Sequence, residues 1–201
     1  MSLFISQTLK FFFLLTPFFG LSMFISMTSG YPPRERRLLA LRVALAAIVI
    51  GLILFFFGGS IFSLFGITVD AFRIGTGILL MLTSISLMNP KPAATNRDLQ
   101  GDIAVVPLAF PIFIGPATTG ALVILSADIT GAAAKAVVAV SWVAAVGCIG
   151  LMLFLAALLE HWLGRRGLGI LMRLTALVLA ALSAQMIMTG VQAFLVGRPS
   201  A

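Results

Sequence analysis

The chain has almost none of the residues that most catalytic and metal sites require. It contains a single cysteine, Cys148, and a single histidine, His161, among 201 residues. One thiol excludes a disulfide framework, and these two side chains supply neither a nucleophile and its base nor a metal-binding cluster. The phosphate-binding pattern G-x-x-x-x-G-K-[ST] is also absent from the sequence. We therefore expect a protein that is not an enzyme, holds no metal or other cofactor and makes no direct use of ATP.

Charge is equally scarce. Asp, Glu, Lys and Arg make up 9% of the chain, hydrophobic residues make up 61%, and the mean hydropathy is +1.17. This composition excludes an ordinary soluble domain and predicts one integral membrane domain over residues 1–201, with the lipid bilayer as its surroundings. At roughly 20 residues per span, the length allows about six helices. The net charge of +7 does not indicate a nucleic-acid partner, because the basic residues lie between apolar runs.

The apolar segment 107–128 contains a break that an ordinary transmembrane helix would not have. Gly115 and Pro116 follow each other near its centre, with Pro107, Pro111 and Gly120 nearby. Proline removes a backbone donor and clashes with the carbonyl four residues back, so two half-helices are predicted. In hydrocarbon, a broken backbone is tolerated where protein or a water-filled cavity satisfies the freed groups. The break predicts a binding site, and the alternative is a packed proline kink.

The rest of the chain divides into similar apolar segments. Residues 1–28 are expected to form a retained first helix, interrupted at Thr16 and Pro17 with Gly20 just beyond. Unbroken helices are predicted over residues 38–59, 71–88, 132–158 and 170–196. Residues 60–70 form a short connection, and a loop carrying Arg165, Arg166 and glycines separates the last two helices. The polar segment 90–103 is predicted to be a cytoplasmic linker.

Residue spacing on either side of this linker predicts an internal repeat. Pro17 precedes Arg73, and Pro116 precedes Arg173, by nearly the same number of residues. Three spans form each half, 1–89 and 104–197, and three is an odd number, so the second half would cross the membrane inverted relative to the first. The predicted fold is thus an all-α membrane protein of six helices in two inverted three-helix repeats, with helices one and four broken.

The basic residues also predict an orientation. Most of them lie in the loops or helix ends on one side, whereas the opposite side has Arg73, Lys135, Arg198 and Lys10. Because Lys and Arg are enriched in cytoplasmic loops, the basic loops are expected in the cytoplasm and both termini outside it. The residues on the basic side are Arg34, Arg36, Arg37, Arg42, Lys91, Arg97, Arg165, Arg166 and Arg173.

The inverted arrangement would direct two helix N-termini at the middle of the membrane. Each N-terminus carries roughly half a positive charge and unpaired N–H groups, which suits a carboxylate or another small anion. No bulky basic cluster lies at this depth, so a small zwitterion or ion fits better than a nucleotide. The predicted substrate-binding residues are Thr16, Pro17, Gly20, Gly115, Pro116, Thr118 and Thr119.

A second set of polar residues follows the predicted helix faces. Arg73, Thr76 and Thr83 share one face of their helix, and Arg173 and Ser183 occupy matching positions in the second half. These five residues are predicted to form a gate or pathway. The alternatives are a local pair between Arg73 and Asp70 and a purely topological role for Arg173. Gln185, Thr189 and Gln192 lie along one face of the last helix and are expected to bond a neighbouring helix.

Several of these segments resemble the MarC family of six-span membrane proteins. The matching motifs are VVPLAFP at 105–111 followed by Gly115 and Pro116, FGI at 65–67, FRIGTG at 72–77 and RERR at 34–37. The resemblance implies a small neutral amino-acid transporter in the inner membrane of a bacterium. The first helix departs from the family pattern, because Thr16 and Pro17 stand where asparagine and proline are usual, followed by Phe19 and Ser22.

These observations predict a secondary transporter of a small polar solute, with export of small neutral amino acids as its specific activity. Transport would proceed by alternating access around the half-helix ends. The alternative is a membrane channel or a lipid-handling scaffold without coupled transport. The expected partners are the bilayer and the solute, with a homo-oligomer left open, and the sequence does not identify the coupling ion.

Overall fold

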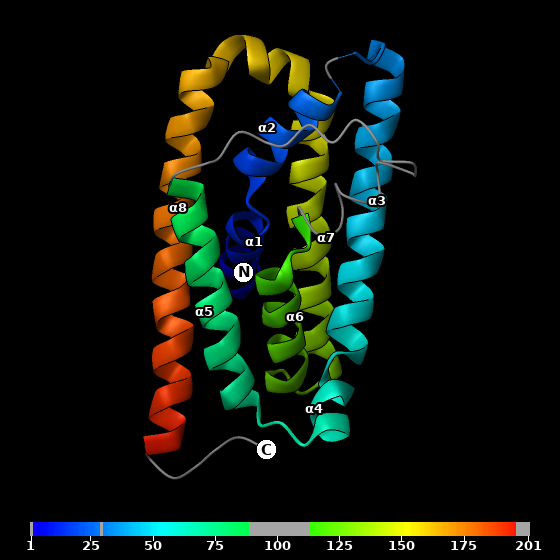
Figure 1. Cartoon of the computed structure of the whole chain (residues 1–201). Coiled ribbons are helices and arrows are strands. Elements are labelled where there is room, and N and C mark those ends of the chain that lie inside the picture. Colours follow the sequence, from blue (N-terminus) through cyan, green and yellow to red (C-terminus); the bar gives the residue numbers. More distant parts are fainter. Residues whose placement is uncertain (1, 29, 89–112, 196–201) are drawn as a thin grey trace.

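The computed structural model describes residues 2–28, 30–88 and 113–195 (Figure 1). Every regular element within these ranges is a helix, and none is a strand. The helices are α1 (Ser2–Leu14), α2 (Pro17–Met27), α3 (Pro33–Phe57), α4 (Gly59–Phe65), α5 (Val69–Met88), α6 (Pro116–Asp128), α7 (Ala132–Phe154) and α8 (Ala156–Leu195).

Four helices in the described ranges are long and apolar enough to cross a membrane. They are α3, α5, α7 and the part of α8 from Arg166 to Leu195. The pair α1 and α2 makes a fifth span if the two are counted as one helix bent by 44°. Helix α6 is apolar but has only 13 residues. The chain is therefore a multi-pass helical membrane protein.

The long helices pack in two antiparallel pairs. Helix α5 packs along α8, α3 packs along α7, and these are the two most extensive helix contacts (Figure 1). Close approach in the second pair depends on Gly51, because a Cβ atom there would lie 2.1 Å from the Trp142 ring. Trp142 is 1% exposed and contacts the edge of Phe11, so this pair also supports α1.

The two short helices α2 and α6 run in opposite directions. Each begins near mid-height in the bundle, α2 leading toward the end where α3 starts and α6 toward the end where α4 lies (Figure 1). Both begin with a proline in the first turn, Pro17 in α2 and Pro116 in α6. Their N-termini therefore lie within the bundle, whereas those of the long helices lie at its ends.

Several segments differ from the sequence predictions. Helix α3 begins at Pro33, five residues before the predicted start at residue 38. The expected connection 60–70 contains most of α4, which ends at Gly66 in the left-handed conformation with φ 62°. The expected loop around Arg165 and Arg166 is helical, and only Gly164, with φ 58°, departs from helical geometry. A single glycine with positive φ is enough to redirect the chain here, so a loop of several residues is not needed. The linker 90–103 and the first part of the broken fourth span lie outside the described residues.

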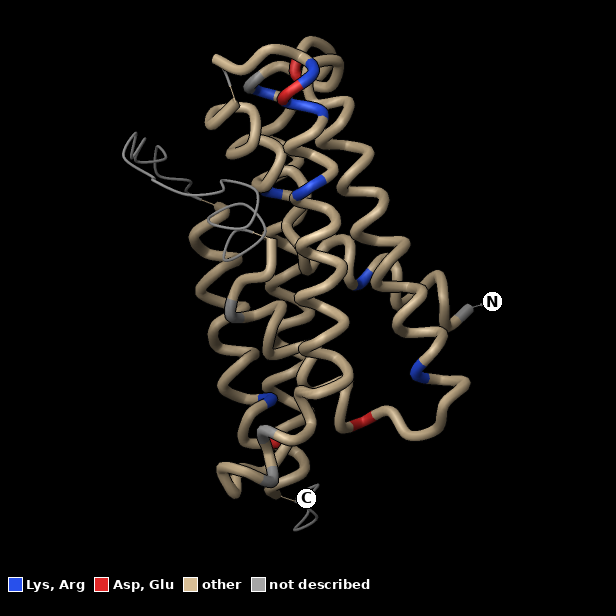
Figure 2. Tube along the Cα trace, turned by 90° about the vertical axis from the view of Figure 1, so that its right-hand side faces the viewer, with Lys and Arg blue, Asp and Glu red and all other residues tan. Residues whose placement is uncertain are grey.

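Charged residues gather at one end of the bundle (Figure 2). The start of α3 contributes Arg34, Arg36 and Arg37, and the start of α8 contributes Glu160. At the opposite end, Arg73 of α5 lies against Asp128 of α6. One end of the helix bundle is therefore strongly basic, and the other end contains an arginine that is paired with a carboxylate.

Candidate functional site

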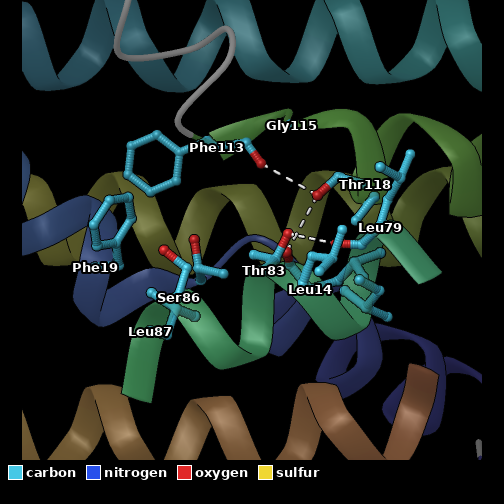
Figure 3. Close-up of a pocket in the computed structure, with 13 residues that line it drawn as sticks. Leu14, Phe19, Leu79, Thr83, Ser86, Leu87, Phe113, Gly115 and Thr118 are labelled. Carbon is cyan, nitrogen blue, oxygen red and sulfur yellow. Dashed lines mark hydrogen bonds between the residues drawn. The ribbon is translucent and has the colours of Figure 1, made fainter. Parts of the chain in front are cut away.

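A cavity of about 460 Å³ lies where the α1–α2 break, the second half of α5 and the start of α6 meet (Figure 3). Its polar lining comes from Thr16, Thr83, Ser86 and Thr118, and Gly115 lines it as well. The remaining lining is apolar and consists of Leu14, Phe19, Leu79, Leu80, Leu82, Leu87, Phe113 and Ala117. No charged residue is among the described residues that line this cavity.

The first wall of the cavity is the break between α1 and α2. Helix α1 ends at Leu14, and Thr16 then adopts a left-handed conformation with φ 48° and ψ 59°. Among non-glycine residues in the described ranges, Thr16 alone has positive φ. The chain resumes as α2 at Pro17, and the Gly20 N–H donates to the Thr16 carbonyl at 3.0 Å. The break predicted at Thr16 and Pro17 is present.

The second wall is the start of α6, which repeats the local pattern of the first. Gly115 is extended, with φ −79° and ψ 177°, and the helix begins at Pro116. The Thr119 N–H donates to the Gly115 carbonyl at 2.9 Å, as Gly20 does to Thr16. Each first turn therefore leaves the N–H groups after its proline without an intrahelical partner. These groups lie beside a cavity whose described lining carries no charge, and they give it a positive potential.

Thr118 joins the two breaks. Its hydroxyl lies 3.2 Å from the Leu14 carbonyl oxygen and 3.3 Å from the Phe113 carbonyl oxygen, and its one proton is shared between these two acceptors (Figure 3). The Leu14 carbonyl lies at the end of α1, where the helix supplies no partner for it. Thr118 is 2% exposed, so this hydroxyl stabilises the broken backbone as well as lining the cavity.

Three other predicted binding residues lie beside the cavity and do not line it. Gly20 is buried against Phe113, and a Cβ atom at Gly20 would lie 2.1 Å from that ring. Pro17 is buried within the first turn of α2. The Thr119 hydroxyl is buried with no hydrogen-bond partner among the described residues. Gly20 thus allows the two breaks to pack closely.

The predicted gate residues are spread over several places. Thr83 lines the cavity, and its hydroxyl donates to the Leu79 carbonyl at 2.8 Å (Figure 3). Thr76 is buried against Gly120 of α6, where a Cβ atom would lie 2.2 Å from its hydroxyl oxygen. Ser183 is fully buried and donates to the Gly77 carbonyl at 2.7 Å, which ties α8 to α5.

Arg73 and Arg173 lie away from the cavity. Arg173 is exposed on α8. Arg73 pairs with both Asp70 and Asp128, with 2.5 Å between guanidinium nitrogen and carboxylate oxygen in each case. The local pair with Asp70 that the helix spacing predicts is therefore present. Arg73 also pairs with a second carboxylate, Asp128 of α6.

Arg73 also lines a second cavity of about 270 Å³. Lys10, Asp128, Gln185 and Thr189 are among the polar residues that line it. Leu14 and Leu80 line both this cavity and the larger one, and they are 7% and 1% exposed. These two leucines therefore separate the two cavities.

Ser86 and Phe113 are among the cavity residues that were not predicted from the sequence. Ser86 follows Thr83 by one helical turn on α5, and this spacing is a signal that the two share a face. Phe113 precedes the Gly115–Pro116 break and is 2% exposed, but nothing in the sequence indicates that its ring packs against Gly20.

Helices that stop inside the bundle around a small cavity define the class of multi-pass membrane proteins with broken spans. Comparison with known sequences gives the family. The chain matches the MarC family of integral membrane proteins over residues 1–195, and it belongs to that family.

Similar proteins occur in archaea and bacteria. The UPF0056 membrane protein MJ1677 of Methanocaldococcus jannaschii is 33% identical over 188 residues, covering 90% of this chain and 92% of the relative. The UPF0056 membrane protein YvbG of Bacillus subtilis is 29% identical and covers 88% of each chain. The UPF0056 inner membrane protein YhgN of Escherichia coli K12 is 27% identical, covering 96% of this chain and 98% of the relative. No solved structure matches the chain.

Proposed function

We propose that the protein is a secondary transporter that exports small neutral amino acids across an inner membrane. The observation that carries this proposal is the cavity at the two helix breaks, where the N-termini of α2 and α6 meet the hydroxyls of Thr16 and Thr118. Its volume of about 460 Å³ is within the usual range for small-molecule sites.

The polar groups that line the cavity favour a zwitterion over an ion. Helix N-termini attract a carboxylate through their N–H groups and dipoles, without requiring a basic side chain. Thr83 and Ser86 on the opposite wall offer hydroxyl oxygens to an ammonium group. Since none of the described lining residues is charged, a solute without net charge enters without leaving an unbalanced charge in the membrane.

Helix packing supports an alternating-access mechanism. The proposed topology has six spans in two inverted repeats, with both termini outside the cytoplasm. Helices α5 and α8 would be equivalent members of the two repeats, as would α3 and α7, and each equivalent pair packs together. The opposite directions of α2 and α6 in Figure 1 agree with the same relation. Rocking of one repeat against the other would expose the cavity to each side in turn.

The test is a side chain placed at the second break. Gly115 has an ordinary extended conformation, so Gly115→Leu does not strain the backbone, yet its side chain would occupy the cavity. We expect this variant to lose uptake and efflux of alanine, serine and glycine in liposomes while still folding. Thr118→Val should weaken transport modestly and also lower stability, because its hydroxyl supports the Leu14 carbonyl at the first break and one hydrogen bond contributes roughly 0.5–1.5 kcal/mol.

Gly169→Leu is the matched control. Gly169 is a glycine of α8, and a Cβ atom there would have no neighbour within 4 Å. The Gly169→Leu variant should transport these amino acids as the parent protein does. If folded Gly115→Leu also transports as the parent does, the cavity is not the solute site. Passive solute flux that does not require alternating access would instead favour the alternative function, a membrane channel.

A further inference from the structure

A second place where cations meet an apolar surface lies at the basic end of the bundle. A cavity of about 410 Å³ is formed where the turn before α3 meets the turn between α7 and α8. Its polar residues are Tyr31, Arg36, Arg37 and His161, and Phe154 lines its inner side. This cavity shares no residue with the proposed transport site.

Arg36 carries donors that the protein leaves unused. Its Nε and Nη2 atoms are buried and have no hydrogen-bond partner among the described residues. The carboxylate of Glu160 lies 3.6 Å from Nη2, which is an ion pair but exceeds hydrogen-bond distance. The Arg36 guanidinium also lies 5.9 Å from the centre of the Phe24 ring. A guanidinium that has lost water and has a carboxylate beyond hydrogen-bond distance favours a further anionic oxygen.

Arg37 provides a second cation whose position is fixed by an aromatic ring. Its guanidinium lies 5.1 Å from the centre of the Phe154 ring, within the range of a cation–π interaction. Arg37 is exposed, so its remaining donors are open to a ligand. Two guanidinium groups on the first turns of one helix, both lining one cavity, form a phosphate-binding arrangement.

An apolar groove continues from this cavity along the membrane-spanning part of α3 and α7. Its volume is about 340 Å³, and Phe154 lines both spaces. Leu41, Leu45 and Leu151 line the groove and are more than half exposed. Gly147 leaves its floor open, because a Cβ atom there would have no neighbour within 4 Å.

We propose that this cavity and groove together bind one anionic phospholipid. The phosphate would lie against Arg36 and Arg37, and an acyl chain would follow the groove past Gly147. The change from cationic to purely apolar lining matches the two ends of a lipid, and basic pockets between transmembrane helices are suited to such head groups. A free phosphate ion would use the arginines but leave the adjoining groove empty.

The experiment measures binding of dioleoyl phosphatidylglycerol to delipidated protein in a non-ionic detergent by native mass spectrometry. We expect one lipid to bind more tightly than dioleoyl phosphatidylcholine. Arg37→Gln should weaken the binding of phosphatidylglycerol roughly fivefold, the usual effect of one basic residue near anionic lipid. Gly147→Leu should weaken it to a similar extent or more, because its side chain would fill the groove.

Two matched variants control for charge and for size. Arg34→Gln removes an exposed charge in the same turn of α3 that does not line the cavity, and Gly75→Leu adds the same side chain at an equally open glycine of α5. Both should bind phosphatidylglycerol as the parent does. Equal losses in Arg34→Gln and Arg37→Gln would mean diffuse attraction and overturn the proposal. So would unchanged binding in Gly147→Leu, or competition by glycerol 3-phosphate as strong as that by the whole lipid.

Discussion

Arg73 holds carboxylates from two different helices. Asp70 lies one turn before it in α5 and is 1% exposed, whereas Asp128 ends α6 and has a side chain that is 39% exposed. A carboxylate withdrawn from water depends strongly on its cation, but an exposed one can be solvated instead. The two ion pairs of Arg73 should therefore contribute very differently to stability.

Arg73→Gln is expected to lower the free energy of unfolding by about 3 kcal/mol, because it leaves the buried Asp70 carboxylate without this cation. Asp128→Asn should lower it by at most about 1 kcal/mol, as for other partly exposed pairs. Denaturant-induced unfolding of the purified variants in one detergent measures both. Equal losses would contradict the distinction drawn from burial.

The helix spacing alone predicts the pair with Asp70, since residues three apart share a helix face. The pair with Asp128 could not be predicted in the same way. It requires α6 to end beside the first turn of α5, which depends on where α6 begins inside the bundle. The same limit applies to Thr118, whose contact with the Leu14 carbonyl joins residues far apart in the chain.

At the scale of helices, glycines set how closely the elements approach. A Cβ atom at Gly20 would lie 2.1 Å from the Phe113 ring, and one at Gly120 would lie 2.2 Å from the Thr76 hydroxyl. In membranes, where lipid removes the hydrophobic drive for helix association, such close packing supplies much of the attraction. The two breaks thus lie close together because Gly20 has no side chain, and hydrogen bonds also join them.

Gly20→Ala should destabilise the protein by about 1–3 kcal/mol, the usual cost of overpacking. The added methyl group would overlap the Phe113 ring, which is 2% exposed and has little room to move. Phe113→Leu should restore part of the loss in the double variant. Differences in melting temperature in one detergent measure the effect.

Gly75→Ala provides the comparison, because its methyl group would meet nothing within 4 Å. In the interior of α5 it should be neutral or stabilising by up to about 1 kcal/mol through helix propensity. A loss at Gly75 as large as that at Gly20 would show that the Phe113 contact is not the cause.

Prolines and long apolar segments made the element boundaries largely predictable. The first break follows from Pro17, and the span predicted over 71–88 begins only two residues later than α5. The short helix α4 and the helical course around Gly164 were not predictable, because glycines there indicate a turn without fixing its length. The half-helix expected before Gly115 remains a prediction outside the described residues.

For the whole molecule, the uneven distribution of charge in Figure 2 bears on topology. If the basic end is cytoplasmic, a reporter active only in the cytoplasm should be active when fused after Asn96 and silent after Thr130 or Ala201. Asn96 and Ala201 lie outside the described residues, and Thr130 lies in the turn between α6 and α7. Enzyme activity normalised to expression level is the measurement. The reverse pattern would place both termini in the cytoplasm.

The left-handed conformation of Thr16 also has a consequence for the order of assembly. Such a conformation costs a non-glycine residue about 1–3 kcal/mol, so the bend needs support from its surroundings. Part of that support comes from Thr118, whose hydroxyl bonds the carbonyl of Leu14 beside the bend. Thr118 is synthesised long after Thr16 itself. The first segment therefore enters the bilayer before this support exists, and the bend gains it only when α6 arrives.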